Sequence, residues 1–209
     1  MATVTRIGIA GYMGAGKSTC ARSFESSGAL LIDADAEAKS MMARSREIRN
    51  GLRRAFGDAV VSGEGLRFDV LGRLAFESAE SLRKLNAVTH PPLVSRVGRL
   101  VRGCEKPLCV LDAALIPLFN IESWFDLCVW VEAPFDVRYD RLKAKLRGMD
   151  ETELARRMRL QEEVMPAPAE GRWAKIPDGD CRGYVLEKLR EMGVDKNILE
   201  PPAGSAQPC

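Results

Sequence analysis

The chain has 209 residues, of which 46% are apolar, a composition that suits one sizeable soluble core rather than two independent domains. The 31 basic and 29 acidic residues leave a net charge of only +2, which argues against a protein that coats nucleic acid. No apolar run approaches the roughly 20 residues that a membrane helix needs, and the first ten residues lack the apolar stretch of a secretion signal. We therefore expect a cytoplasmic protein with neither a nucleic-acid nor a membrane partner.

The first predicted strand, residues 6–10 (RIGIA), leads into GYMGAGKST at residues 11–19. The glycine-x4-glycine-lysine-serine spacing is that of a P-loop, whose glycines let backbone N–H groups point inward toward phosphate oxygens. In a P-loop the lysine neutralises the outer phosphates and the serine hydroxyl binds Mg²⁺. A strand before the motif and a helix-like stretch after it argue against a chance match. The sequence therefore predicts a site for a nucleoside triphosphate with Mg²⁺, with candidate residues Gly11, Gly14, Ala15, Gly16, Lys17, Ser18 and Thr19.

Further apolar runs of strand length alternate with helix-like stretches, and this alternation is typical of a parallel sheet with helices on both faces. The runs that end near residues 112 and 132 are almost continuously apolar, as expected for strands buried on both sides. The sequence thus predicts an α/β fold whose remaining strands are residues 29–32, 107–112, 127–132 and, more weakly, 172–176.

About 70 residues separate the second predicted strand from the third, far more than one crossover helix needs. Apolar periodicity within this gap predicts helices at 37–56, 68–78 and 80–102. We interpret residues 36–103 as a helical, acceptor-binding insertion over the carboxyl edge of the sheet. Its HPP sequence at residues 90–92 is expected to kink or break the last helix.

Two more helices are predicted at 135–147 and 151–165, with Asp150 as the N-cap of the second. From Arg138 to Arg159 there are eight basic and four acidic residues. We interpret residues 135–167 as a basic lid over the triphosphate. The nucleotide-binding core is then residues 1–35, 104–134 and 168–195, and the Pro/Gly/Ser-rich stretch 200–209 is expected to be a disordered tail.

Six cysteines are scattered along the chain without any C-x2-C pairing, which predicts neither a zinc site nor a disulfide framework. We expect most of these thiols to be reduced, two of them inside strands. They are Cys20, Cys104, Cys109, Cys128, Cys181 and Cys209.

Acidic residues end two of the predicted strands, at the sheet edge where ligands of open α/β proteins bind. Asp33 and Asp35 follow the second strand, and Asp112 ends the third. A P-loop kinase needs a carboxylate near Mg²⁺ and benefits from one that orients the acceptor hydroxyl. Ser18 and Asp112 are therefore the candidate metal residues and Asp33 a candidate catalytic residue. Helix or strand capping remains an alternative role for all three aspartates.

Among the basic residues of the predicted lid, Arg141 and Arg147 are the candidates for contact with the transferring phosphoryl group, Arg141 as a catalytic residue. A solvated helical face is the alternative, and it is expected for most of the other basic residues. His90 is the only histidine and lies beside two prolines, where a structural role is expected more often than catalysis.

The chain resembles the dephospho-coenzyme A kinases, which are P-loop proteins similar to nucleoside-monophosphate kinases. The resemblance covers about residues 6–190, and the DAD and HPP elements are its specific part. It implies ATP-dependent phosphorylation of the ribose 3′-hydroxyl of dephospho-coenzyme A, with Asp33 at the attacking hydroxyl and with Arg67 and His90 also on the acceptor side. The matching segments are GYMGAGKST, GALLIDADAEAKS, FGDAVVSGEG, LNAVTHPPL, VLDAALI, DLCVWVEAPFDVRYDRL and RRMRLQ.

The chain departs from the family pattern at several positions, all on the acceptor or adenine side. An arginine of the family is replaced by Phe68, with Arg67 one step aside, and a lid arginine is replaced by Lys145. Two other functions therefore stay open: another small-molecule P-loop kinase, or a degenerate ATP-binding protein without turnover. A GTPase switch is disfavoured because the N-K-x-D motif is missing. The remaining departures are Ala114, Pro117 and Asp178.

Overall fold

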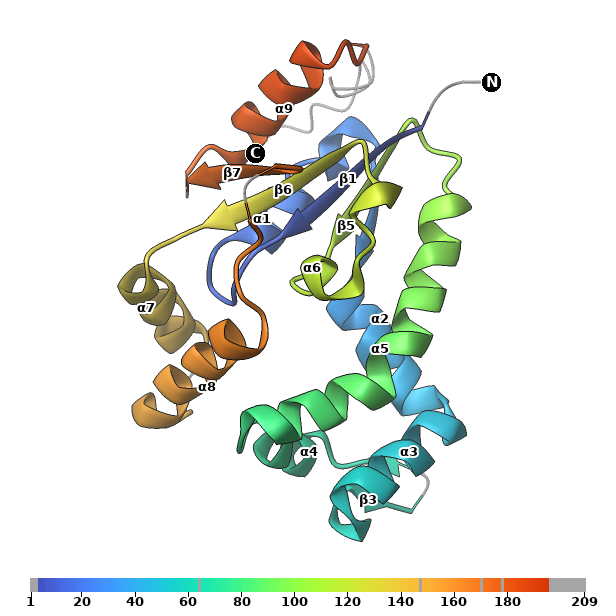
Figure 1. Cartoon of the computed structure of the whole chain (residues 1–209), viewed down its shortest axis with the longest axis vertical. Coiled ribbons are helices and arrows are strands. Elements are labelled where there is room, and N and C mark those ends of the chain that lie inside the picture. Colours follow the sequence, from blue (N-terminus) through green and yellow to red (C-terminus); the bar gives the residue numbers. More distant parts are fainter. Residues whose placement is uncertain (1–3, 64, 147, 170, 178, 196–209) are drawn as a thin grey trace.

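The structure, a computed structural model, describes residues 4–63, 65–146, 148–169, 171–177 and 179–195. Five parallel strands form the central sheet, in the order β2-β5-β1-β6-β7 (Figure 1). All five strands predicted from the sequence are confirmed, with ends that differ by at most one residue. Their bounds are β1 Thr5–Ala10, β2 Leu30–Asp33, β5 Leu108–Asp112, β6 Leu127–Glu132 and β7 Trp173–Pro177.

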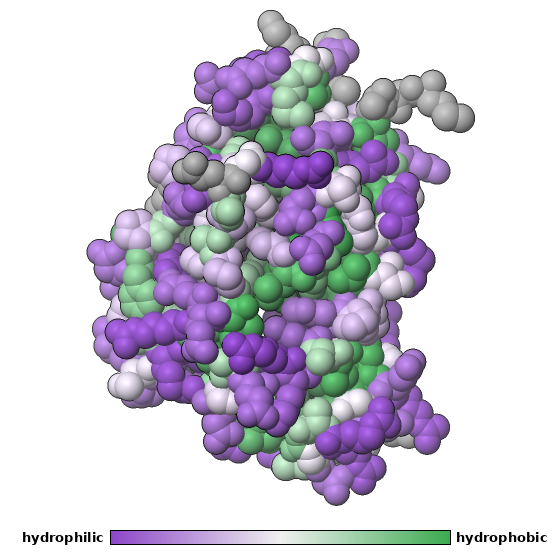
Figure 2. Space-filling view, in the orientation of Figure 1, coloured by the Kyte–Doolittle hydropathy of each residue, from purple (hydrophilic) through white to green (hydrophobic). Residues whose placement is uncertain are grey.

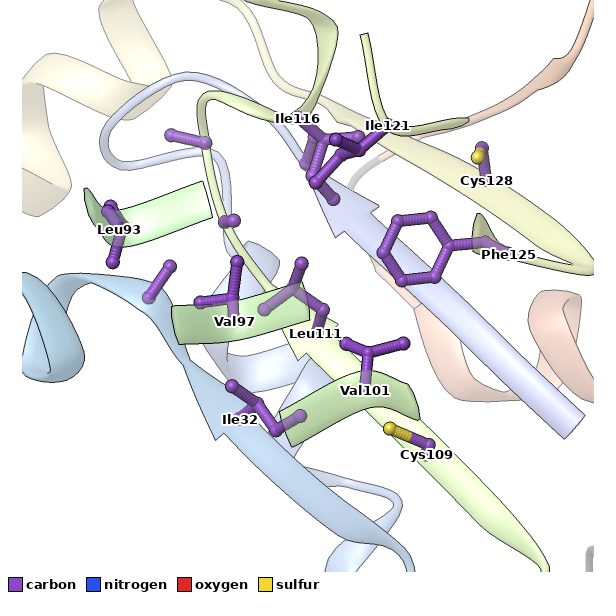
Figure 3. Close-up of a cluster of buried hydrophobic side chains, with 14 of the residues drawn as sticks. Ile32, Leu93, Val97, Val101, Cys109, Leu111, Ile116, Ile121, Phe125 and Cys128 are labelled. Carbon is purple, nitrogen blue, oxygen red and sulfur yellow. The ribbon is translucent and has the colours of Figure 1, made fainter. Parts of the chain in front are cut away.

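Apolar side chains cover both faces of this sheet, which explains why its strands have near-continuous apolar sequences. One face packs against α1 (Lys17–Arg22) and α9 (Cys181–Glu191). The other face packs against the second half of α5 (Ala79–Arg102), where Val97 and Val101 lie over the strands near Leu111 (Figure 3). The predicted parallel sheet with helices on both faces is thereby confirmed.

Helices α2, α3 and α4 and the first half of α5 extend away from the sheet and contain a third apolar cluster, around Leu52 and Leu71 (Figure 1). One helix was predicted at 37–56, and this is wrong in detail because the stretch forms two helices. Ser45 has extended backbone angles and accepts a hydrogen bond from the Ile48 N–H, so it ends one helix and caps the next. The bounds are α2 Ala34–Arg44, α3 Arg46–Phe56, the short hairpin strands β3 Val61–Ser62 and β4 Gly65–Leu66, and α4 Phe68–Ala75.

Helix α5 continues through the HPP sequence and bends, so of the two expected outcomes the kink is confirmed and the break is wrong (Figure 1). Pro91 and Pro92 lie inside the helix, and Figure 1 shows that α5 changes direction about halfway along its length. Proline removes one backbone donor and crowds the preceding turn, which bends a helix without ending it when packing holds both halves. Here Leu82 is buried in the first half and Leu93 and Val97 in the second.

The predicted lid corresponds to two helices joined by a short turn, α7 Phe135–Lys145 and α8 Glu151–Val164. Asp150 caps α8 by accepting a hydrogen bond from the Glu153 N–H at 3.0 Å, as predicted. The Glu153 side chain pairs with Arg156 and Arg157. The domain boundaries at 36–103 and 135–167 stay predictions. The remaining short elements are α6 Ile116–Phe119 and three 3₁₀ turns, Glu25–Ser27, Asp58–Val60 and Glu122–Trp124.

Two cysteines form a disulfide bond, which corrects the prediction that no disulfide links the chain. Cys20 in α1 and Cys181 at the start of α9 lie 161 residues apart in sequence, with Cα atoms 5.5 Å apart. The fold alone brings them together, because α1 and α9 cover the same face of the sheet. Cys104, Cys109 and Cys128 are free and buried, and Cys109 and Cys128 lie in strands as expected. Cys209 and the rest of the predicted tail lie outside the described residues.

Within the ranges that the structure describes, none of the helices is both long and apolar enough to cross a membrane.

Candidate active site

The loop between β1 and α1 has the backbone geometry that a phosphate cradle requires. Gly14 has φ +80°, and a Cβ atom at this position would lie 2.7 Å from the carbonyl oxygen of Arg138. A Cβ atom at Gly11 would lie 2.7 Å from the carbonyl oxygen of Val131. Only glycine allows this backbone to pass so close to β6 and α7. Gly16 then starts α1 from a left-handed conformation.

A pocket of about 680 Å³ opens beside this loop. Its volume falls in the usual range for small-molecule and cofactor sites. The walls come from the P-loop, from α7 and from the segment that precedes α9. The pocket contains seven of the sequence-predicted nucleotide and lid residues, which are Gly14, Ala15, Gly16, Lys17, Ser18, Thr19 and Arg141.

The carboxylates predicted at the strand ends meet next to the P-loop. Strand register pairs Asp33 of β2 with Asp112 of β5. The Lys17 ammonium lies 3.7 Å from Asp112 Oδ1, and both side chains are largely buried. The chain thus places a cation and a carboxylate in contact where a parallel sheet normally binds its ligands.

Asp112 sits in a strongly polarised environment. Burial is the main reason that its pKa lies above the ordinary value of 3.8. The Lys17 ammonium and a hydrogen bond with Ser18 act against this rise, and the neighbouring charges of Asp33 and Asp35 add to it. Burial prevails over Lys17 because their 3.7 Å separation is longer than a charge-assisted hydrogen bond. A further positive charge at this point would therefore stabilise the ionised form.

The residues present fit a magnesium ion. Asp112 Oδ1 is buried and has no hydrogen-bond partner among the described residues. Mg²⁺ prefers oxygen ligands and is usually held by one or two side chains together with water and phosphate oxygens. No cluster of three or more His, Cys, Asp or Glu side chains able to hold a metal occurs in the described ranges. Ser18 and Asp112 therefore suit a metal that arrives with the nucleotide better than a resident metal.

The two aspartates that follow β2 differ in what they contact. Asp33 caps α2, because its Oδ1 accepts a hydrogen bond from the Ala36 N–H at 3.0 Å. Asp35 lies in the first turn of α2 and lines the pocket. The capping alternative is thus realised at Asp33, although a carboxylate has further lone pairs for a ligand.

The acceptor-side residues predicted from the resemblance do not line this pocket. His90 packs edge-on against the Phe119 ring at a centroid distance of 4.9 Å, and burial lowers its pKa to about 4. Arg67 is exposed and immediately precedes α4, which begins with Phe68, a side chain that is 43% exposed. Arg67 therefore lies just before α4 and His90 lies within α5, and neither lines the pocket beside the P-loop.

Of the predicted lid residues, Arg141 reaches the P-loop. Its Nη1 donates a long hydrogen bond of 3.4 Å to the Gly14 carbonyl oxygen. Lys145, one of the departures from the family pattern, also lines the pocket. Arg147 lies outside the described residues.

Contacts between the P-loop and the lid helices were missed by the sequence analysis. Arg138 of α7 is 3% exposed, and its guanidinium lies over the Tyr12 ring, 5.0 Å from the centroid. Gln161 of α8 accepts a hydrogen bond from the Met13 N–H at 2.8 Å. In the sequence, Gln161 was marked only as part of the RRMRLQ segment, and this segment does not indicate which residue Gln161 contacts. Arg182, which also lines the pocket, had no signal.

The parallel sheet, the glycine-rich loop and the Lys17–Asp112 pair at the strand ends define a P-loop nucleotide-binding fold. A model of the dephospho-CoA kinase family matches residues 5–172, and the chain belongs to this family.

Two relatives agree with this family assignment, and one solved structure shares the fold. The dephospho-CoA kinase of Corynebacterium diphtheriae is 34% identical over 187 residues, which cover 88% of this chain and 92% of that protein. The dephospho-CoA kinase of Thermobifida fusca is 33% identical over 159 residues, covering 75% and 78% of the two chains. The crystal structure of TT1252 from Thermus thermophilus matches with a TM-score of 0.67 and 29% identity over 90% of this chain and 98% of that one.

Proposed function

We propose that the chain transfers the γ-phosphoryl group of ATP to the ribose 3′-hydroxyl of dephospho-coenzyme A. This reaction gives coenzyme A and ends its biosynthesis. The observation that carries the proposal is the register of Asp33 with Asp112 beside Lys17, in a chain of the dephospho-CoA kinase family. This arrangement places the Lys17 charge, for the phosphates, and the Asp33 carboxylate, for the acceptor hydroxyl, at one edge of the sheet.

The P-loop would bind the triphosphate. The backbone N–H groups of its glycine turn would donate hydrogen bonds to the phosphate oxygens, and Lys17 would stabilise the negative charge that develops toward the leaving oxygen. The Lys17 ammonium now contacts Asp112 at 3.7 Å and would be shared with the nucleotide. Because phosphoryl transfer passes through a loose transition state, such fixed charges carry most of the catalysis.

Ser18 and Asp112 would hold the magnesium ion, Ser18 through its hydroxyl and Asp112 through its buried Oδ1. When bound, Mg²⁺ supplies charge neutralisation on the outer phosphates. The pKa of Asp112, raised by burial, then returns toward its ordinary value because a cation favours the carboxylate.

Asp33 would orient the attacking hydroxyl. One of its oxygens caps α2, which fixes the carboxylate in a single orientation at the end of β2. A carboxylate is a weak base for an alcohol, so orientation is its main contribution. The proton leaves late, as the bond to phosphorus forms.

Arg141 would stabilise the charge on the transferring group. Its guanidinium already contacts the P-loop at Gly14 and lines the pocket. Guanidinium groups placed on the phosphoryl oxygens act most strongly in the transition state, when charge spreads over these oxygens.

The helical insertion would bind the rest of the acceptor. Figure 2 shows apolar side chains gathered in the middle of the face seen in Figure 1, where α5 and α6 lie. Leu118 of α6 is 37% exposed there, and His90 packs against the neighbouring Phe119. Such a surface suits the long, mostly uncharged pantetheine arm, and Arg67 is the candidate partner for the acceptor's phosphates.

The test is ATP consumption by the purified protein with dephospho-coenzyme A, AMP, adenosine and other small alcohols as acceptors. We expect rapid ADP formation with dephospho-coenzyme A. Preference for another acceptor would favour another small-molecule kinase, and ATP binding without turnover of any acceptor would favour a degenerate binding protein. The cytoplasmic location and the absence of a nucleic-acid partner also stay predictions.

A further inference from the structure

A hydrogen bond connects the P-loop to α8 across 148 residues of sequence. The Met13 N–H donates to Gln161 Oε1 at 2.8 Å, and the bond is partly buried. Met13 is the second residue of the four-residue turn in which the Ala15 N–H donates to the Tyr12 carbonyl oxygen. Because the Met13 N–H donates to α8, it is not available as a phosphate-binding donor.

The same turn is held on its other side by α7. The Arg138 guanidinium covers the Tyr12 ring, and the Arg138 backbone leaves no room for a side chain at Gly14. Arg138 also forms an ion pair with Glu162, the residue after Gln161. The turn before Lys17 is therefore enclosed by both lid helices, and Gln161 supplies the hydrogen bond from α8.

The first half of α8 contacts the insertion. Arg156 donates hydrogen bonds to the carbonyl oxygens of Phe76 and Glu77, which follow α4. The Arg157 guanidinium lies over the Phe76 ring, 5.0 Å from the centroid. One helix thus contacts the insertion near its start and the P-loop near its end.

We propose that Gln161 is a positioning residue for phosphoryl transfer. Its side-chain carbonyl holds the Met13 N–H and so sets the orientation of the loop that carries Lys17. Through α8 this orientation is coupled to the helices of the insertion. The inference rests on the proposed kinase function, because a positioned Lys17 matters for transfer of the phosphoryl group.

The main test replaces Gln161 with Met, which has a similar length but lacks the acceptor. A tilted loop still allows ATP to adapt in the ground state, whereas the transition state requires alignment of the reacting atoms. We expect Gln161→Met to lower kcat about 10-fold, equivalent to ~1.4 kcal/mol. The KM for ATP should change less than about 3-fold, because binding in the ground state is largely kept. Gln161→Asn, whose side chain is one methylene too short to reach the Met13 N–H, should show the same fall in kcat. It serves as the test variant if Gln161→Met does not fold.

Two controls separate positioning from folding. Gln161→Glu keeps an oxygen acceptor and should restore kcat to within about 3-fold of the wild type. Glu163→Gln changes an exposed residue of the same helix and should leave kcat unchanged. With ¹⁵N-methionine labelling, the Met13 amide resonance should shift in Gln161→Met and stay in place in Glu163→Gln. The Met13 resonance is assigned as the one that disappears from the spectrum of Met13→Leu.

An unchanged kcat in Gln161→Met, an unchanged Met13 resonance, or failure of Gln161→Glu to restore turnover would overturn the inference. The proposed function is tested separately. If the wild type phosphorylates AMP rather than dephospho-coenzyme A, the proposed acceptor is wrong. The ratio of kcat between Gln161→Met and the wild type with AMP would still decide the role of Gln161.

Discussion

Lys17 carries the charge on which the proposed reaction depends most. Its ammonium lies in the P-loop and contacts Asp112, so Lys17→Ala would remove charge stabilisation from the transferring phosphoryl group and leave a buried carboxylate unpaired. We expect turnover to fall at least about 10²-fold. Steady-state ADP formation measures this, with the exposed Lys39→Ala as the control. Normal turnover by Lys17→Ala would rule out a P-loop kinase mechanism.

Asp33 and Asp35 allow a direct comparison of two neighbouring carboxylates. Asp33→Asn keeps a good helix cap, so stability should change little, but the charge that orients the hydroxyl is lost. We expect turnover to collapse while ATP affinity stays nearly constant, and Asp35→Asn to be milder. Turnover and ATP binding are measured for both variants. Since Asp35 rather than Asp33 lines the nucleotide pocket, equal losses would show that the roles are assigned wrongly.

His90 makes stability depend on pH in a known direction. Burial lowers its pKa from 6.5 to about 4, so the folded protein keeps this ring neutral where the unfolded chain binds a proton. The stability from His90 is therefore complete above pH 6.5 and is lost as the pH falls from 6.5 toward 4. Between pH 7.5 and pH 5 the melting temperature should fall by roughly a few degrees more in the wild type than in His90→Gln. Equal decreases in the two proteins would contradict the buried neutral ring.

At the scale of elements, the disulfide between α1 and α9 should stabilise the fold. It closes a loop across 161 residues, and a disulfide of a long loop typically contributes about 2–4 kcal/mol. Reduction should lower the melting temperature by roughly 5–15 °C, with no such response in Cys20→Ser. Alkylation of the denatured, unreduced protein should modify two fewer cysteines than the six in the sequence. Full modification of all six would show that the bond is absent.

The elements that could be predicted from the sequence are those with a local signal. Strands buried on both faces appear as apolar runs, and the P-loop has a fixed spacing of glycine, lysine and serine. The break at Ser45 and the continuation of α5 through Pro91 depend on packing between distant segments. The same holds for Cys20 with Cys181, whose contact exists only in the folded chain.

The candidate site shows the same division between local and distant information. Most P-loop residues and Arg141 lie where the motif and the basic pattern predicted, around one pocket. The contacts of Met13 with Gln161 and of Tyr12 with Arg138 could not be predicted, because neither partner has a distinctive residue type or spacing. Roles in catalysis and in acceptor binding stay predictions that only the variants can test.

At the scale of the whole molecule, the sheet, the helices α2–α5 and the pair α7–α8 surround the proposed reaction site (Figure 1). The P-loop follows a strand of the sheet, and helices α2–α5 would hold the acceptor. The pair α7–α8 contacts the P-loop and the segment after α4. Binding energy from the pantetheine arm, remote from the reacting oxygen, should therefore help to orient the 3′-hydroxyl and appear in kcat as well as in KM.

The most direct test of this account compares dephospho-coenzyme A with AMP and adenosine as acceptors in steady state and locates the new phosphate by NMR. We predict that kcat/KM for dephospho-coenzyme A exceeds that for the other two by at least about 10²-fold, equivalent to ~2.7 kcal/mol, with phosphate on the 3′-oxygen alone. Comparable values for AMP, or phosphate on any other oxygen, would contradict it.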